Sequence, residues 1–293
     1  MNKKPFNSLN DYFVRYFFTD KGGEKVLLDF INAVMISANM KTFKSVEILN
    51  PFNLKKNYSD KETIVDVKCI TKNGTVVIIE VQLSGNSRFP ERILYYWSTN
   101  YSKLLKKGEG YEDLTPVISI NLLNFNLNKK DSNVHSCYMI YNTKNKRLLT
   151  DHLQIHIIEL KKFNFKNNNL SKDLNYWLGF FTTKNMEEYM SEIVKEKPIM
   201  EEAHRRYNNF IRSRLMMSEY EKKEIYQYDK QIMLKDERRE GIKEGMKKGK
   251  LEGLKEGRIA EQISMAKSMK TKNLDINLIS EITGLTIDEI KKL

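Results

Sequence analysis

Asp66, Glu80 and Gln82 are the residues of this sequence whose types and spacing most strongly indicate chemistry. They lie in residues 63–83, TIVDVKCITKNGTVVIIEVQL, where β-branched residues are frequent on both sides of an Asn-Gly turn signal. This pattern predicts a β-hairpin with one acid on each strand. Two carboxylates about 5 Å apart on neighbouring strands repel each other unless a cation lies between them. A hard divalent ion such as Mg²⁺ binds carboxylate oxygens and keeps water ligands for hydrolysis.

The length of the turn decides whether the two acids can meet. A two-residue turn at Asn73-Gly74 would pair Asp66 with Val81, and the two acids would point to opposite faces. A three-residue loop at 72–74, with its glycine in the left-handed conformation, would place Asp66 directly opposite Glu80. A shared cation site requires this second arrangement. The other face would then carry apolar residues that can be buried, namely Val65, Val67, Ile79 and Val81.

The alternative is that both acids are solvated residues on the exposed face of an amphipathic sheet, which is the commoner position of acids on strands. Apolar residues that we assign to the same face argue against this alternative, because a face of mixed character is usually half-buried. Buried acids in turn require a partner. The apolar residues are Ile64, Ile70, Ile78 and Leu83.

The motifs around the hairpin carry a resemblance to a known family. Asp66 followed by Glu80-Val81-Gln82 resembles the core of the PD-(D/E)xK nucleases, with glutamine at the position usually held by lysine. In their order along the chain, the flanking motifs resemble the bacterial Rpn recombination-promoting nucleases, which are often labelled transposases. The resemblance covers residues 5–165 well and the glycine-rich tail more loosely. It rests on NDYF at 10–13, LDFIN at 28–32, EILNP at 47–51, DK at 60–61, RILYYW at 92–97, GEGY at 108–111 and PVISIN at 116–121.

This resemblance implies an Mg²⁺-dependent (or Mn²⁺-dependent) DNA endonuclease of broad specificity that hydrolyses phosphodiester bonds and promotes DNA recombination in mobile elements. Asp66 and Glu80 would hold the metal together with the backbone carbonyl of Val81, and Gln82 would hold a water molecule by hydrogen bonds. The alternative is a catalytically weak or inactive protein of the same fold that binds DNA and assembles as an oligomer. A cut-and-paste transposase is disfavoured, because the sequence shows no convincing Asp-Asp-Glu triad of that other fold.

Two further residues are candidates for the neighbourhood of the metal. The fold that the resemblance implies brings Asp11 close to it, although the helix dipole also favours an acid at a helix start. Lys68 lies on the same strand face as Asp66 and is a candidate source of positive charge. Its alternative is a solvated strand lysine.

Arg88 and Arg92 share a helical face after the hairpin and are candidates for binding DNA phosphates, Arg92 above all because it opens a matched motif. The alternative for Arg92 is an ion pair with an acid such as Glu91 or Asp113, or a simple surface charge.

The histidines and cysteines indicate no further metal site. His152 and His156 have the spacing of helical metal ligands, but they lie in a strand-like run, where they would be about 13 Å apart. Cys69 and Cys137 lack metal-ligand spacing and are typical of buried thiols in a reducing cytoplasm. His135 and His204 have no companions that would suggest nucleophilic catalysis.

The elements that must position these residues predict an α/β fold, with a mixed β-sheet flanked by helices in the restriction-endonuclease-like arrangement and a helical C-terminal extension. We expect a nuclease core at 1–165, a helical region at 166–235, a charged glycine-rich helix at 236–270 and a helix-turn-helix-like tail at 271–293. A helix start is predicted at 8–11, further helices at 24–38, 90–107, 174–181, 186–195 and onward from 198, and further strands at 45–49, 116–123, 135–141 and 153–160.

Glycine recurs at every fourth position from Gly241 to Gly257. Each glycine costs a helix roughly 1 kcal/mol relative to alanine, but a ridge of small residues permits close approach of a second helix. We expect an oligomerisation helix, with a partly disordered charged linker as the alternative. The tail should form two short helices around Gly284, with Thr286 and Glu289 as a capping box. Acids at the start of the second helix would repel DNA phosphates.

Composition agrees with a nucleic-acid partner but is not specific. Lysine and arginine number 50 against 38 acids, giving a net charge of +12 and a pI near 9.3. Such a charge favours nucleic acids or anionic membranes, although abundant lysine and asparagine also accompany an AT-rich genome. No apolar run reaches 18 residues and the N-terminus lacks the pattern of a signal peptide, so we expect a cytoplasmic protein without membrane contact.

Overall fold

The computed structural model describes residues 6–50, 52, 66–85 and 88–293. The chain divides into two compact units, Met1–Glu224 and Ile225–Leu293. The first unit contains the sheet and the candidate site. Of the expected core residues, Ile64 and Val65 lie outside the described residues.

The described part of the first unit contains a six-stranded mixed sheet with the order β1-β2-β3-β4-β6-β5. The strands β3, β4 and β6 run parallel, whereas β1 and β2 pair antiparallel with their neighbours, as does β5 at the other edge. The mixed sheet that the sequence predicts is confirmed. The strands are β1 (Val46–Ile48), β2 (Val67–Thr71), β3 (Val76–Gln82), β4 (Val117–Leu123), β5 (His135–Tyr141) and β6 (Leu148–Glu159).

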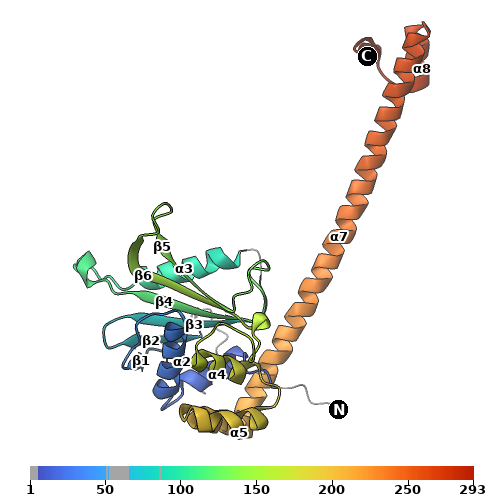
Figure 1. Cartoon of the computed structure of the whole chain (residues 1–293). Coiled ribbons are helices and arrows are strands. Elements are labelled where there is room, and N and C mark those ends of the chain that lie inside the picture. Colours follow the sequence, from blue (N-terminus) through green and yellow to red (C-terminus); the bar gives the residue numbers. More distant parts are fainter. Residues whose placement is uncertain (1–5, 51, 53–65, 86–87) are drawn as a thin grey trace. The chain divides into compact units, whose positions relative to one another are not determined.

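Helices cover both faces of this sheet (Figure 1). The helix α3 packs on one face through two smaller apolar clusters, and the remaining helices of the unit contribute to the large apolar cluster on the other face. The helices are α1 (Asp11–Thr19), α2 (Glu24–Ser37), α3 (Phe89–Ser102), α4 (Lys172–Thr182), α5 (Met186–Glu196), α6 (Ile199–Arg212) and the first turns of α7 (Arg214–Thr271).

Alternation along β3 explains why the site faces α3. Ile79 and Val81 belong to the large cluster, whereas Ile78 packs against α3 with Trp97 and Tyr101 nearby. Glu80 and Gln82 have the same parity as Ile78, because side chains of a strand alternate between its faces.

Our assignment of Leu83 to the Glu80 face is wrong. Leu83 packs against the large cluster on the opposite face, together with Val81. It lies three positions after Glu80, and an odd separation along a strand changes the face.

Helix α1 begins as the sequence predicts. Asn10 is its N-cap, and its side-chain oxygen accepts hydrogen bonds from the backbone N–H groups of Tyr12 and Phe13. Phe13 and Phe17 are fully buried in the large cluster. The cap therefore fixes where the helix begins, and Asp11 follows directly in its first turn.

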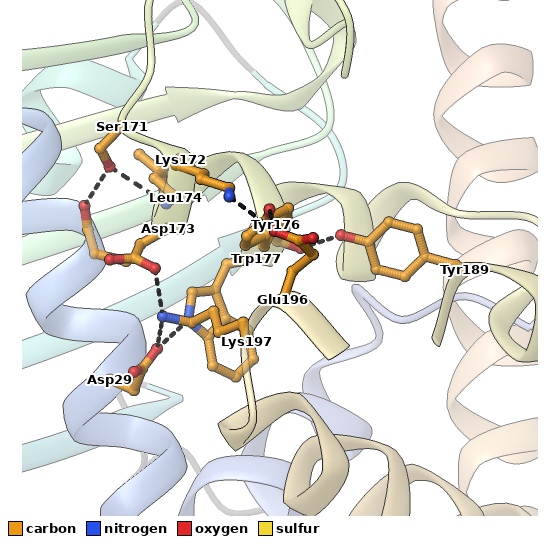
Figure 2. A network of polar contacts seen from close by, with 11 residues as sticks. Asp29, Ser171, Lys172, Asp173, Leu174, Tyr176, Trp177, Tyr189, Glu196 and Lys197 are labelled. Atoms are coloured by element: carbon orange, nitrogen blue, oxygen red, sulfur yellow. Dashed lines mark hydrogen bonds and ion pairs between the residues drawn. The ribbon is translucent and has the colours of Figure 1, made fainter. Parts of the chain in front are cut away.

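A network of polar contacts ties α2 to α4 and α5 (Figure 2). The buried Lys197 ammonium lies 2.7 Å from a carboxylate oxygen of Asp29 and 2.7 Å from one of Asp173. Trp177 donates its indole N–H to the same Asp29 oxygen at 2.8 Å. A buried ammonium with two carboxylate partners avoids the penalty of an unpaired buried charge. The network therefore holds α2, α4 and the C-terminal end of α5 together.

The second unit is helical throughout most of its length. Helix α7 continues without interruption through all five glycines, and a Cβ added at any of them would meet nothing within 4 Å. The structure thus has a helix where a charged linker was the alternative. Helices α8 (Ile276–Thr283) and α9 (Ile287–Lys291) follow, separated by Gly284 at φ +71°, and the Thr286–Glu289 capping box is confirmed.

The four-part division of the chain at 165, 235 and 270 stays a prediction. Within the described residues, no helix is long and apolar enough to cross a membrane.

Candidate functional site

The turn between β2 and β3 has the three-residue form that the two acids require. The Thr71 N–H donates to the Thr75 carbonyl at 2.9 Å, and Gly74 has a φ of +81°. The strands pair in the matching register, and continuing that register by one residue places Asp66 opposite Glu80. The expected three-residue loop is therefore confirmed.

Glu80 is an acid in an unusually dry position on a central strand. It is only 3% exposed, and its Oε1 atom has no hydrogen-bond partner within the part of the chain that the structure describes. Its other oxygen accepts a long hydrogen bond of 3.4 Å from the Gln82 amide. Burial, together with the nearby negative charge of Asp66, raises the pKa of Glu80 to about 8. At neutral pH this carboxyl therefore lacks the partner that its ionised form requires.

Asp66 has a similar electrostatic environment. Its Oδ2 accepts a hydrogen bond of 2.7 Å from the backbone N–H of Val81. Burial and the negative charge of Asp11 nevertheless raise the pKa of Asp66 to about 7, against the opposing effect of Arg15 and Lys223. The structure thus places the carboxyl group of Asp66, directly before β2, near that of Glu80 on β3, and both resist ionisation in the absence of a further cation.

Asn121 adds an oxygen that the sequence reasoning did not single out. It pairs with Glu80 across the parallel strands β3 and β4 and is fully buried. Its amide nitrogen donates to Ser119 Oγ at 3.0 Å and to the His156 carbonyl at 3.2 Å, whereas its Oδ1 has no partner among the described residues. In the described part of the chain, two neighbouring residues on adjacent strands therefore each carry a buried oxygen with no hydrogen-bond donor.

Asp11 lies in the first turn of α1, and its charge acts on Asp66. Its Oδ1 accepts a hydrogen bond of 2.8 Å from the backbone N–H of Tyr12, which fits an acid favoured by the helix terminus. Its Oδ2 lies 3.6 Å from the ammonium of Lys223. Both interpretations of Asp11 thus have structural support, because it stabilises the helix start and also contributes charge to the site.

The side chains of Gln82 and Arg92 are hydrogen-bonded to each other. Arg92 donates a hydrogen bond to the Gln82 side-chain oxygen, and its positive charge opposes the raised pKa of Glu80. Its guanidinium also lies over the Phe89 ring. Among the described residues, Glu91 forms its ion pair with Arg88 and not with Arg92. The sequence grouped Arg92 with Arg88, but the structure joins it to Gln82.

Arg88 and Lys68 interact with charged residues other than Asp66 and Glu80. The Arg88 guanidinium is largely exposed and 3.1 Å from a Glu91 oxygen. Lys68 is half-buried, and burial together with the charge of Lys103 lowers its pKa. The cations that act on Asp66 are instead Arg15 and Lys223.

The sequence reasoning found no partner for His135, but the structure provides one. His135 Nε2 lies 3.0 Å from His156 Nδ1, and Cys137 Sγ lies 3.8 Å from His156 Nε2. Burial lowers the pKa of His135 to about 4 and that of His156 to about 3, so both rings are neutral at pH 7. The signal was the alternation of His135 and Cys137 on an edge strand, which becomes informative only once β5 is paired with β6.

The donors at the Asp66–Glu80 pair suit a hard cation. Among the residues that the structure describes, no three His, Cys, Asp or Glu side chains converge on a common point. A cation there would therefore be held by two carboxylates with neutral oxygens and water, a ligand set that Mg²⁺ accepts. The oxygens without donors on Glu80 and Asn121 fit such an ion, since a cation satisfies them without any hydrogen-bond donor.

A mixed sheet with an acid before one strand of a hairpin, and a Glu-Val-Gln triplet on the next, defines a restriction-endonuclease-like nuclease fold. The family described as PD-(D/E)XK nuclease family transposase matches residues 8–237. The chain belongs to this family. The match includes α1, the hairpin and the first part of α7. Comparison with curated proteins and with solved structures gives no significant match.

Proposed function

We propose that this chain is an Mg²⁺-dependent (or Mn²⁺-dependent) DNA endonuclease that hydrolyses phosphodiester bonds. Membership of a nuclease family supports the reaction class. The observation that carries the proposal is the pair of the half-buried Asp66 and the buried Glu80, whose pKa values are both raised. Once they ionise, two such neighbouring acids destabilise a fold, so their presence is best explained by a bound cation.

Asp66, Glu80 and the backbone carbonyl of Val81 would hold the ion. When bound, a divalent ion polarises a phosphate oxygen and lowers the pKa of coordinated water. The Val81 N–H already donates to Asp66, which orients that carboxylate. Asn121 on β4 pairs with Glu80 and would offer its side-chain oxygen to the ion, because both of its amide N–H groups donate to Ser119 and His156.

Gln82 and Arg92 would orient the substrate and the attacking water. An amide can both donate to and accept from a water molecule, although it brings no charge. Arg92 holds the Gln82 oxygen, so the Gln82 N–H bonds are directed toward Glu80. The guanidinium of Arg92 and the exposed guanidinium of Arg88 are suited to binding backbone phosphates.

Broad specificity and a role in recombination of mobile elements are part of this proposal. The short helix α9 begins with two acids, which disfavours its use as a reader of base edges. Phosphate contacts carry no sequence information, so a basic protein that uses them cuts many sequences. We also propose self-association through the glycine ridge of α7, since its open surface can admit a second helix.

A second candidate is a weakly active or inactive protein that binds DNA and assembles into oligomers. The observation in its favour is the glutamine at position 82, because the usual lysine there would supply a positive charge. The two candidates differ in what the carboxylates do. A nuclease requires Asp66 and Glu80 for cleavage, whereas a binding protein would bind DNA equally well without them.

The test is cleavage of supercoiled plasmid and linear DNA in Mg²⁺, Ca²⁺ and EDTA. We expect nicking or cutting in Mg²⁺, with a loss of at least about 100-fold in Asp66→Ala and Glu80→Ala. Glu192→Ala, an exposed acid on α5, is the matched control and should cut like the parent. No cutting, with unchanged DNA binding by both site variants, would favour the assembly protein. Equal cutting by parent and site variants would contradict the proposed site.

A further inference from the structure

Position 82 of the site carries glutamine instead of lysine, yet a lysine from a distant part of the chain lies beside the acids. The Lys223 ammonium is 3.6 Å from Asp11 Oδ2, and its charge also acts on Asp66. Lys223 belongs to the first turns of α7 and is separated from Asp66 by more than 150 positions in the sequence. It lies within the first compact unit and within the region that matches the nuclease family.

The position of Lys223 is fixed by contacts on both sides of it in α7. Tyr220 is buried, its ring stacks on Phe6, and its hydroxyl accepts the Asn7 N–H at 2.7 Å. Glu224 accepts hydrogen bonds from the side-chain amides of Asn7 at 3.1 Å and Asn10 at 2.8 Å. Asn10 is also the N-cap of α1. The helix start that carries Asp11 is therefore docked directly onto the turn that carries Lys223.

The other cations near the site have different interactions from that of Lys223. Lys68 lies near the charge of Lys103, and Arg92 holds the Gln82 oxygen. Arg15 acts on Asp66 from α1 itself. Lys223 differs from these because its side chain is about one-third exposed and ends in a compact ammonium, which can turn toward an approaching anion.

We propose that Lys223 supplies from α7 the positive charge that glutamine at position 82 does not. This inference rests on the proposed nuclease function. A DNA phosphate approaching Asp11, Asp66 and Glu80 meets three carboxylates, and an ammonium beside Asp11 offsets part of their repulsion. Lys223 thus acts as a positioning residue, since it neutralises and orients Asp11 and eases the approach of the phosphate.

The test compares Lys223→Met and Lys223→Arg with the parent in single-turnover plasmid cleavage. We expect Lys223→Met to cut about 10- to 100-fold more slowly, while Lys223→Arg, which keeps the charge, stays within about threefold. Lys222→Met is the matched control, because Lys222 is exposed, pairs with Glu219 and should be dispensable. Parental cleavage by Lys223→Met would overturn the inference. An equal loss in Lys223→Met and Lys223→Arg, with a lowered melting temperature, would also overturn it and indicate a purely structural contact.

A second measurement separates this inference from the proposed function. Removing a cation from beside the acids should raise the Mn²⁺ affinity of Lys223→Met several-fold, measured by electron paramagnetic resonance without DNA. Unchanged or weaker binding would contradict the role of Lys223, even if the parent cuts DNA. If the parent neither cuts DNA nor binds Mn²⁺, the nuclease proposal fails first. If the parent cuts and all Lys223 variants cut equally, only the inference about Lys223 fails.

Discussion

At the scale of single residues, the site consists of groups whose local surroundings oppose their ionisation. Glu80 is buried on a central strand. Asp66 accepts a hydrogen bond from the backbone N–H of Val81, but the negative charge of Asp11 opposes its ionisation. Both carboxyls favour the protonated form in the absence of a cation. A metal ion would reverse this preference, because it binds only the ionised carboxylates.

This environment predicts how stability depends on pH. The folded pKa values of Asp66 and Glu80 lie near 7 and 8, above those of the unfolded chain, so the fold binds more protons. Their stabilising contribution is complete below about pH 4 and is lost as the pH rises through 7 to 8. In EDTA, the parent should therefore lose about 5 °C more in melting temperature between pH 5.5 and 8.5 than Asp66→Asn/Glu80→Gln.

Mg²⁺ should restore this loss in the parent, and the restoration should grow with pH because the metal binds the ionised acids. The double variant should show no Mg²⁺ effect at either pH. The same pH profile for parent and variant in EDTA would contradict the electrostatic interpretation.

The residues of the site differ in how far the sequence predicts them. Asp66, Glu80 and Gln82 could be predicted because all three lie in one hairpin, where the turn fixes which side chains share a face. Asn121 and Lys223 were not, because their roles depend on which strand lies beside β3 and on where α7 docks. Period and local spacing do not encode such long-range contacts.

At the scale of elements, the turn of the hairpin determines whether a site exists. Its left-handed glycine was predictable, since Gly74 follows Asn73 in a turn signal and glycine adopts positive φ without strain. The strand β6 was less predictable. It begins at Leu148 rather than near 153, because its pairing with β5 extends through residues 148–152.

A side chain at Gly74 should therefore destabilise the fold. Gly74 has φ +81°, and an added Cβ would lie 2.8 Å from the Thr115 methyl group. Gly74→Ala should lower the free energy of unfolding by about 2 kcal/mol, from backbone strain plus this contact. Gly22→Ala is the matched control, because Gly22 has φ +80° with open space around it, and it should lose only about 1 kcal/mol.

Urea denaturation of both variants measures the difference. Equal losses would show that the contact with Thr115 contributes nothing.

At the scale of the whole molecule, α7 begins in the first compact unit and ends in the second. Its first turns contain Tyr220, Lys223 and Glu224, which contact the start of α1. Its later part contains the glycine ridge. The sequence left the ridge open between helix and linker because glycine disfavours a helix while the lysines and glutamates around it favour one. The structure has a helix at these glycines. Their role in self-association stays a proposal.

The glycine ridge predicts opposite effects on helix stability and on association. Replacing Gly245, Gly249 and Gly253 by alanine should stabilise α7 by roughly 1 kcal/mol per site in a single chain, because each Cβ would enter open space. If a second copy packs along the ridge, the same three changes should weaken self-association at least about tenfold. Analytical ultracentrifugation with circular dichroism measures both effects.

A matched control shifts the three alanines by one position, to Glu244, Lys248 and Glu252, which lie along a neighbouring line of the helix. Association should then be nearly unchanged. Equal self-association of the parent and the glycine variant would contradict packing along the ridge.

Binding of a divalent ion at Asp66 and Glu80 is the claim on which the other interpretations depend. Titration of the parent with Mn²⁺ at pH 8, followed by electron paramagnetic resonance, measures it directly. We expect at least one bound ion, with affinity lowered at least about tenfold in Glu80→Gln and in Asp66→Asn and unchanged in Glu192→Gln. Equal Mn²⁺ binding by the parent and both site variants would contradict a metal site at this hairpin.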